Sequence, residues 1–210
     1  RLTQAGSDIR LDPPVRTHAE GYLSIDPATR ASLEIDQSMR GTREGSLLAA
    51  IDRTVTAPGA RLLADRLARP SLDKPDIEAR LDAAAWFASD RDAVQTVRAR
   101  LKAAPDLDRA RTRLRLGRGG PRDLSAIAHS LRAAHDAAAA LSEDAKALPV
   151  KIRSAAMALD LSNHDELKNL SDDLYQALTD NPPMLARDGG FVAPGWDKSL
   201  DEARRLRDDS

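Results

Sequence analysis

Cysteine is absent from the sequence, and aromatic residues are scarce: the 210 residues include two Trp, two Tyr and two Phe. Without cysteine the chain can form no disulfide, no thiolate nucleophile and no Cys-ligated zinc site, and a reducing compartment is the expected setting. With so few aromatic side chains, the core must be filled by Ala, Leu, Ile and Val, a mixture that suits closely packed helices better than sheets. The composition therefore predicts a mainly α-helical protein.

Long apolar runs and an excess of charge of one sign are also missing. No apolar stretch approaches the roughly 20 residues that a membrane-spanning helix needs, and no signal-peptide pattern opens the chain. The 32 basic and 33 acidic residues leave a net charge of −1. This balance argues against a general electrostatic attraction to nucleic acid or membranes, but it leaves room for a local patch. We expect a cytoplasmic protein of one or two domains with no membrane segment.

Apolar residues recur at helical spacing through most of the chain. The stripes that mark the expected helices cover residues 47–51, 62–67, 77–88, 94–101, 107–114, 124–141 and 167–174. Thr56 is expected to cap the second of these helices, and Pro105 is expected in the first turn of the fifth. Asn163, with Glu166 three residues later, has the spacing of a capping box for the last.

Residues 21–36 are the only convincing candidate for β structure. Tyr22–Ile25 and Leu33–Ile35 are short apolar or alternating runs, and Asp26–Arg30 between them is typical of a turn. The predicted fold is therefore a multi-helix domain with one small β element.

Both ends of the chain resemble cuts in a longer protein. Residues 1–20 carry Pro13-Pro14 and little periodicity, as a linker would. At the other end, Leu200, Ala203 and Leu206 form a helical stripe that meets no Gly, Asn or Pro stop signal. We expect functional sites of the longer protein to lie outside these residues.

Patterns that carry catalytic or cofactor chemistry are not found. Gly117–Pro121 lacks the Lys of a phosphate-binding loop, and Pro121 removes one N–H, so a turn between helices is the favoured interpretation. Of the four histidines, His18, His129, His135 and His164, no two have the spacing of metal ligands on one helix. His135 lies on the Leu131 face and is interpreted as a half-buried packing residue. We predict no catalytic, cofactor-binding or metal-binding residue.

Six arginines are concentrated between residues 109 and 122, at positions Arg109, Arg111, Arg113, Arg115, Arg118 and Arg122. Such a cluster could hold the phosphates of DNA. Alternate residues on a helix point to different faces, however, and no aromatic residue interleaves with the arginines. Pairing with Asp106, Asp108 and Asp123 is the favoured interpretation, and the question of DNA contact stays open.

Twelve short segments share an order and spacing that carry a family resemblance: residues 25–30, 33–35, 45–48, 51–56, 59–63, 80–82, 106–109, 116–124, 181–183, 187–190, 195–197 and 200–202. Read together, they resemble the core and lever region of the MutS family of DNA mismatch repair proteins. Asp108 stands where the family often has Glu, and Trp196 where it often has Tyr. Ser71 interrupts a frequent Pro-Leu pair.

The resemblance implies a domain organisation. Residues 1–20 would be the tail of a preceding connector domain, residues 21–195 a helical core domain, and residues 196–210 the start of a lever helix leading toward a clamp domain. The Phe-x-Glu motif of the family's mismatch-reading domain and the P-loop of its ATPase domain do not occur here. The resemblance thus implies a framework without enzymatic activity, which transmits conformational change between the ATPase and DNA-clamping parts.

For the whole protein, the resemblance implies binding of mismatched duplex DNA and binding and hydrolysis of ATP with magnesium. It also implies a homodimer and a MutL-type partner. Two other hypotheses stay open. One is a free-standing helical interaction module that docks a partner on the exposed face of the 121–141 helix. The other is a helical domain that binds DNA through the arginines of residues 109–122.

Overall fold

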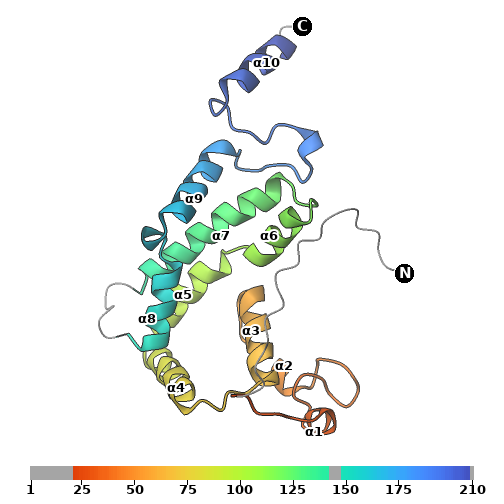
Figure 1. The fold of residues 1–210 in the computed structure, drawn as a ribbon, viewed down its shortest axis with the longest axis vertical. Helices are drawn as coiled ribbons and strands as arrows, with labels where there is room; N and C mark the ends of the chain where they lie inside the picture. Colours follow the sequence, from red (N-terminus) through yellow and green to blue (C-terminus); the bar gives the residue numbers. More distant parts are fainter. Residues whose placement is uncertain (1–20, 142–147, 209–210) are drawn as a thin grey trace. The chain divides into compact units, whose positions relative to one another are not determined.

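The computed structural model describes residues 21–141 and 148–208, which fold mainly as α-helices (Figure 1). This confirms the predicted fold class. Within the described residues, no helix has both the length and the apolar character needed to span a membrane. The helices are α1 (Pro27–Ser32), α2 (Leu47–Ile51), α3 (Ala57–Ala68), α4 (Lys74–Ser89), α5 (Arg91–Lys102), α6 (Leu107–Arg115), α7 (Pro121–Ala139), α8 (Val150–Leu159), α9 (Asp165–Ala177) and α10 (Lys198–Asp208), with short 3-10 helices η2 (Leu161–Asn163) and η3 (Ala186–Asp188).

The chain divides into two compact units. Among the described residues, the first unit holds 21–52 and 63–77, and the second holds 53–62, 78–141 and 148–208. The three boundaries therefore fall between α2 and α3, inside α3 and inside α4. The predicted tail at residues 1–20 lies outside the described residues, and the predicted division at residue 196 stays a prediction.

The first unit contains the segment predicted to form a small β element, and here the structure differs from the prediction. Its pairing is an isolated antiparallel bridge between Tyr22 and Ser71, flanked by a 2.8 Å bond from the Leu23 N–H to the Pro70 carbonyl. Leu33–Ile35 form no strand. Instead, the Ile35 side chain is buried in the core of this unit with that of Leu48.

The segment Asp26–Arg30 is a helix start rather than a turn between strands. The Asp26 carboxylate accepts hydrogen bonds from the Thr29 hydroxyl (2.6 Å) and N–H (2.9 Å), which lower the pKa of Asp26 below its ordinary value, the hydroxyl bond most. Pro27 occupies the first helical position. An Asp cap followed by proline is a helix-opening signal, and α1 forms because these local bonds satisfy its first N–H groups.

The second unit is built around α7, which packs against α5, α6, α8 and α9 (Figure 1). Its inward positions are small or medium in size: Ala128, Ala137 and Ala138 are almost fully buried, and Leu131 is buried with them. Alanine on a helix face lets neighbouring helices approach closely. The Ser130 hydroxyl lies 2.7 Å from the Ala126 carbonyl of α7 and 2.9 Å from the Pro105 carbonyl, so the segment before α6 lies against α7.

Of the three helix starts predicted from capping or first-turn residues, one is confirmed and two are wrong in detail. The Thr56 hydroxyl accepts from the Gly59 N–H at 3.1 Å, as expected of a cap. Pro105 lies before α6, because Asp106 caps that helix through the Arg109 N–H at 3.2 Å. Asn163 forms no capping box; its side-chain amide donates to the Met157 carbonyl at 3.2 Å, and α9 begins after His164.

Truncation of the buried Leu131 tests the role of α7 as the core of the second unit. We expect Leu131→Ala to lower the free energy of unfolding by about 2–5 kcal/mol, because it leaves a cavity among packed helices. Urea denaturation followed by circular dichroism measures the change. Leu170→Ala, at a position 44% exposed on α9, is the control and should cost less than about 1 kcal/mol. Equal losses in the two variants would contradict a core centred on α7.

Candidate functional site

The turn between α6 and α7 is formed by the glycine-rich segment Gly117–Gly120. Gly117 has a φ of +65°, which favours glycine. A Cβ atom on Gly119 would lie 2.5 Å from the Leu114 side chain, and one on Gly120 would lie 2.2 Å from the Met184 carbonyl oxygen. The segment is thus the predicted helix–helix turn, and its glycines allow close backbone approach.

A carboxylate holds this turn together. The two oxygens of Asp123 accept from the Arg113 Nε at 3.0 and 3.2 Å, and one of them accepts from the Gly120 N–H at 2.9 Å. Arg113 also donates from Nη2 to the Arg118 carbonyl at 3.2 Å. The end of α6, the turn and the start of α7 are therefore joined by one ion-paired network.

The arginine cluster of residues 109–122 does not act as a single group. Arg113 pairs with Asp123, and Arg111 lies 3.6 Å from Asp108, so two of the predicted pairings are present. Arg122 donates instead from Nε to the Pro182 carbonyl at 3.0 Å, a partner 60 residues along the chain. Nothing in the sequence near Arg122 indicated that partner. Arg109, Arg115 and Arg118 are exposed.

Sequence reasoning also missed Arg61 of α3 as a partner of the α6 cap. Its guanidinium donates to both oxygens of Asp106, at 2.9 and 3.1 Å, and lies 3.6 Å from Asp108. The hydrogen bond from Arg61 is the main cause that lowers the pKa of Asp106, and the same bond raises the pKa of Arg61. A carboxylate that caps α6 is thereby also tied to α3.

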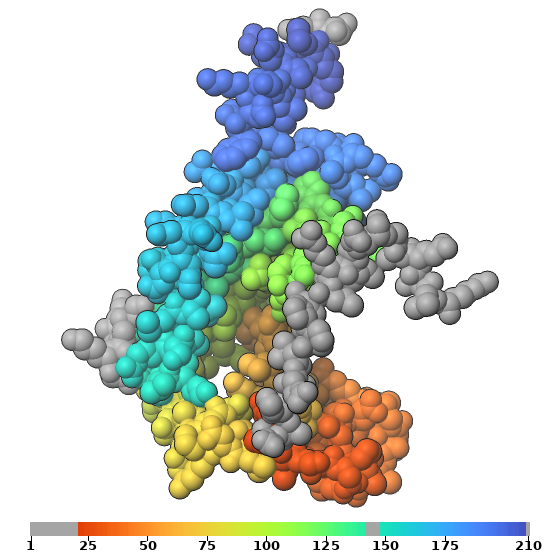
Figure 2. Space-filling view, in the orientation of Figure 1, coloured from red at the N-terminus to blue at the C-terminus, as the bar shows by residue number. Residues whose placement is uncertain are grey.

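The connection between α9 and α10, residues 178–197, is attached at two places. Near the end of α9, Leu178 and Val192 form an antiparallel bridge, with bonds from the Thr179 N–H to the Phe191 carbonyl (2.9 Å) and from the Ala193 N–H to the Ala177 carbonyl (2.8 Å). Near the α6–α7 turn, the connection is held at the buried Pro182 and at Met184. Figure 2 shows the green atoms of the turn against the blue atoms of the connection.

Helix α10 is tied to this connection through its first turns. Arg204 donates from Nη2 to the Val192 carbonyl at 2.8 Å and pairs with Asp201 at 2.9 Å. Asp201 in turn accepts from the Gly195 N–H at 2.6 Å. Asp197 caps the helix by accepting from the Leu200 N–H at 3.0 Å. Contacts therefore run without interruption from the bridge at the end of α9 into α10.

The histidines do not meet as metal ligands. The half-buried His135 has its Nδ1 3.1 Å from Asp160 Oδ1, without the alignment of a hydrogen bond. The pKa of Asp160 is lowered chiefly by hydrogen bonds from Ser162. Across residues 21–141 and 148–208, no group of three or more His, Asp or Glu is placed to hold a metal ion. His164 precedes α9, and His18 lies outside the described residues.

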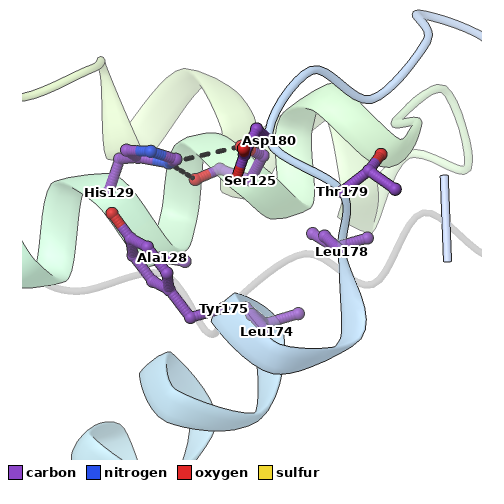
Figure 3. A pocket seen from close by; sticks show the side chains of 8 residues that line it. All are labelled: Ser125, Ala128, His129, Leu174, Tyr175, Leu178, Thr179 and Asp180. Carbon is purple, nitrogen blue, oxygen red and sulfur yellow. Dashed lines mark hydrogen bonds between the residues drawn. The ribbon is translucent and has the colours of Figure 1, made fainter. Parts of the chain in front are cut away.

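A cavity of about 250 Å³ between α7 and the end of α9 brings together a serine, a histidine and an aspartate (Figure 3). His129 Nδ1 lies 2.8 Å from the Ser125 carbonyl and 3.2 Å from the Ser125 hydroxyl. A carbonyl oxygen can only accept, so Nδ1 carries the proton and cannot take one from the hydroxyl. Ser125, His129 and Asp180 therefore lack the arrangement of a nucleophilic triad.

The side chains of His129 and Arg132 both pack on Tyr175. The rings of His129 and Tyr175 are 5.1 Å apart, and the Arg132 guanidinium lies 4.3 Å from the centre of the Tyr175 ring. Arg132 also lies 3.6 Å from Asp172. These contacts hold α9 against α7, and the rings of His129 and Tyr175 therefore have a packing role.

A second cavity, also of about 250 Å³, opens between α4, α5, α7 and α8 and is almost wholly apolar. Its walls include Phe87, Val97, Leu101 and Ile152. No described polar group converges there in a way that would orient a substrate. The candidate functional site of the second unit is therefore the α6–α7 turn together with the connection to α10.

Comparison with known proteins identifies the family to which the chain belongs. Residues 28–208 match the family model of MutS domain III. The chain belongs to the MutS family. It is 50% identical over 99% of its length to the DNA mismatch repair protein MutS of Cereibacter sphaeroides (strain ATCC 17025), covering 23% of that relative. Over its whole length it is 49% identical to the protein of that name from Caulobacter sp. (strain K31), covering 24% of it.

The MutS family membership places the described geometry in domain III. The chain spans about a quarter of the length of the curated relatives it matches. The matched range includes the α6–α7 turn, the connection and α10. The resemblance inferred from the sequence segments is therefore confirmed.

The pair formed by Arg61 and Asp106 predicts a pH dependence of the stability of this MutS domain. The native pKa of Asp106 lies below its ordinary value of 3.8. Its ionised form therefore stabilises the native state above that pH, and the contribution is lost as the pH falls through the lowered native pKa. We expect wild type to exceed Asp106→Asn in unfolding free energy near neutral pH, and the difference to shrink on acidification.

Urea denaturation at a series of pH values measures this difference. Asp173→Asn, at an exposed position of α9, is the control and should show no such trend. A constant difference between wild type and Asp106→Asn from neutral to acid pH would contradict the ion-pair linkage.

Proposed function

We propose that this chain is a framework element of a MutS-type mismatch repair protein, which transmits conformational change between ATPase and DNA-clamping parts. For the whole protein we propose binding of mismatched duplex DNA and binding and hydrolysis of ATP with magnesium. We also propose a homodimer, a MutL-type partner and a cytoplasmic location. The curated relatives, which are named as DNA mismatch repair proteins, support the proposal at the level of the family.

The observation that carries the framework role is the path of contacts from the core of the second unit into α10. The α6–α7 turn binds the connection at Pro182, the bridge at Leu178 and Val192 fixes it to α9, and Arg204 joins it to α10. Each contact is a directional hydrogen bond. A displacement of the α6–α7 turn or of α9 would therefore move the connection, and with it the Val192 carbonyl to which α10 is bonded. Such a path suits the start of a lever.

Close packing around α7 supports the same role. Ala128, Ala137 and Ala138 are each at most 2% exposed, and each also lines one of the two cavities of about 250 Å³ beside α7. Closely packed interiors deform little and move as bodies rather than absorbing a displacement. Stiffness of this kind is what a part between two working domains requires.

We further propose that the chain carries no catalytic site of its own. The arrangement of Ser125 and His129 supports this, because the proton on His129 Nδ1 faces a carbonyl and this nitrogen therefore cannot act as a base toward the serine hydroxyl. The ATP and magnesium chemistry would then belong to other parts of the whole protein. ATP hydrolysis by the 210-residue chain alone would contradict the proposal.

A chimera tests the framework role directly. In it, this chain replaces the corresponding residues of the Caulobacter sp. (strain K31) relative, to which it is 49% identical. We expect the chimera to hydrolyse ATP faster in the presence of mismatched DNA. Arg204→Ala should keep the basal hydrolysis and DNA binding but lose stimulation by roughly fivefold or more, the typical size of an allosteric coupling.

Arg205→Ala is the matched control, because it removes an exposed arginine from the same turn of α10. It should leave the stimulation unchanged. Steady-state hydrolysis and DNA-binding titrations provide the three readouts. If mismatched DNA still stimulates the Arg204→Ala chimera in full, transmission through this end of α10 is contradicted. If Arg204→Ala instead abolishes basal hydrolysis, Arg204 has a role other than transmission.

A further inference from the structure

The connection to α10 touches the α6–α7 turn through backbone atoms. The Met184 carbonyl oxygen lies so close to Gly120 that a Cβ there would be 2.2 Å away. Pro182, two residues earlier, is buried and accepts through its carbonyl from Arg122 Nε at 3.0 Å. Glycine permits the first contact because it has no side chain, and arginine supplies the directional bond of the second.

The turn that receives the connection is itself fixed. The Asp123 carboxylate accepts from Arg113 of α6 and from the Gly120 N–H at the start of α7. Gly120 is thus held by its own N–H at the point where Met184 approaches. Because the Gly120 backbone is fixed, its contact with Met184 also fixes the position of Met184 relative to α7. A contact with a mobile side chain would not fix that position.

The connection is held at two attachments, which restrict its orientation more than a single attachment would. The bridge between Leu178 and Val192 ties the first residue of the connection to a residue near its far end, close to α9. A segment held there alone could pivot about the bridge, but a second attachment at residues 182–184 removes that freedom. Since α10 binds the connection through Val192 and Gly195, the direction of α10 depends on how the connection is held.

We propose that Arg122 and Gly120 are positioning residues that set the direction of α10 by holding residues 182–184 on the α6–α7 turn. This inference rests on the proposed function and names the residues through which the helical core would direct its lever. It also gives Arg122 a role distinct from that of its neighbours in the arginine cluster. The bond to Pro182, rather than the charge, is what matters.

A distance measurement in the 210-residue chain tests this inference without DNA or nucleotide. The chain has no cysteine, so Asp136→Cys on α7 and Glu202→Cys on α10, both at exposed positions, accept nitroxide labels selectively. Pulsed electron spin resonance then gives the distribution of label separations. We expect a single narrow distribution in the doubly labelled chain, because α10 is held in one direction.

Arg122→Ala and Gly120→Ala should each broaden this distribution, the first by removing the bond to Pro182 and the second by pushing Met184 away. Arg122→Lys should restore much of the narrow distribution, because its ammonium group can still donate to the carbonyl. Arg118→Ala, which removes an exposed arginine of the same turn, should leave the distribution unchanged. Circular dichroism confirms that each variant keeps its helical content.

The outcomes separate this inference from the proposed function. If Arg122→Ala and Gly120→Ala, both folded, leave the narrow distribution intact while Arg204→Ala broadens it, the bridge alone sets the direction and the positioning role is overturned. If the labelled chain without further substitution already gives a broad distribution, the proposed function as a stiff framework is contradicted. If Arg118→Ala broadens it as much as Arg122→Ala, charge rather than the bond to Pro182 is responsible, which also overturns the inference.

Discussion

The close packing of α7 is the constraint on which the second unit depends. A chain with six aromatic residues cannot fill wide gaps between helices, so its helices must approach closely. Ala128, Ala137 and Ala138 make that approach possible on α7, where Leu131 is also buried. Outside the two cavities beside α7, these helices are packed together, and a displacement of one is passed to the next. The scarcity of aromatic residues and the stiffness proposed for the chain thus have one physical origin.

Packing alone would not fix the direction of the helices, and polar side chains do this at their ends. Asp106 both caps α6 and binds Arg61 of α3, while Asp123 both caps α7 and binds Arg113 of α6. In each case one carboxylate satisfies backbone N–H groups and an arginine from another helix. Such a residue joins local folding to the packing of helices, since its loss would release both at once.

The local parts of this arrangement could be predicted from the sequence, whereas the long-range parts could not. The stripe at residues 124–141 and the cap at Thr56 follow from spacing within one helix, and α7 and α3 formed where they indicated. The bond from Arg122 to Pro182 spans 60 residues, and no local pattern encodes it. Asn163 shows a local error, because the Met157 carbonyl, six residues earlier in α8, accepts from the side chain that the pattern assigned to a cap.

The arginine cluster separates the framework role from the DNA-binding alternative. Binding to a phosphate backbone needs guanidinium groups that are available together on one surface. Here Arg113 donates to Asp123 and Arg122 to a carbonyl of the connection, so the fold holds these two guanidinium groups in separate orientations. DNA binding through the whole cluster would have to fit arginines held in this way. The same two bonds favour a role in which the arginines hold α6, α7 and the connection to α10 in one arrangement.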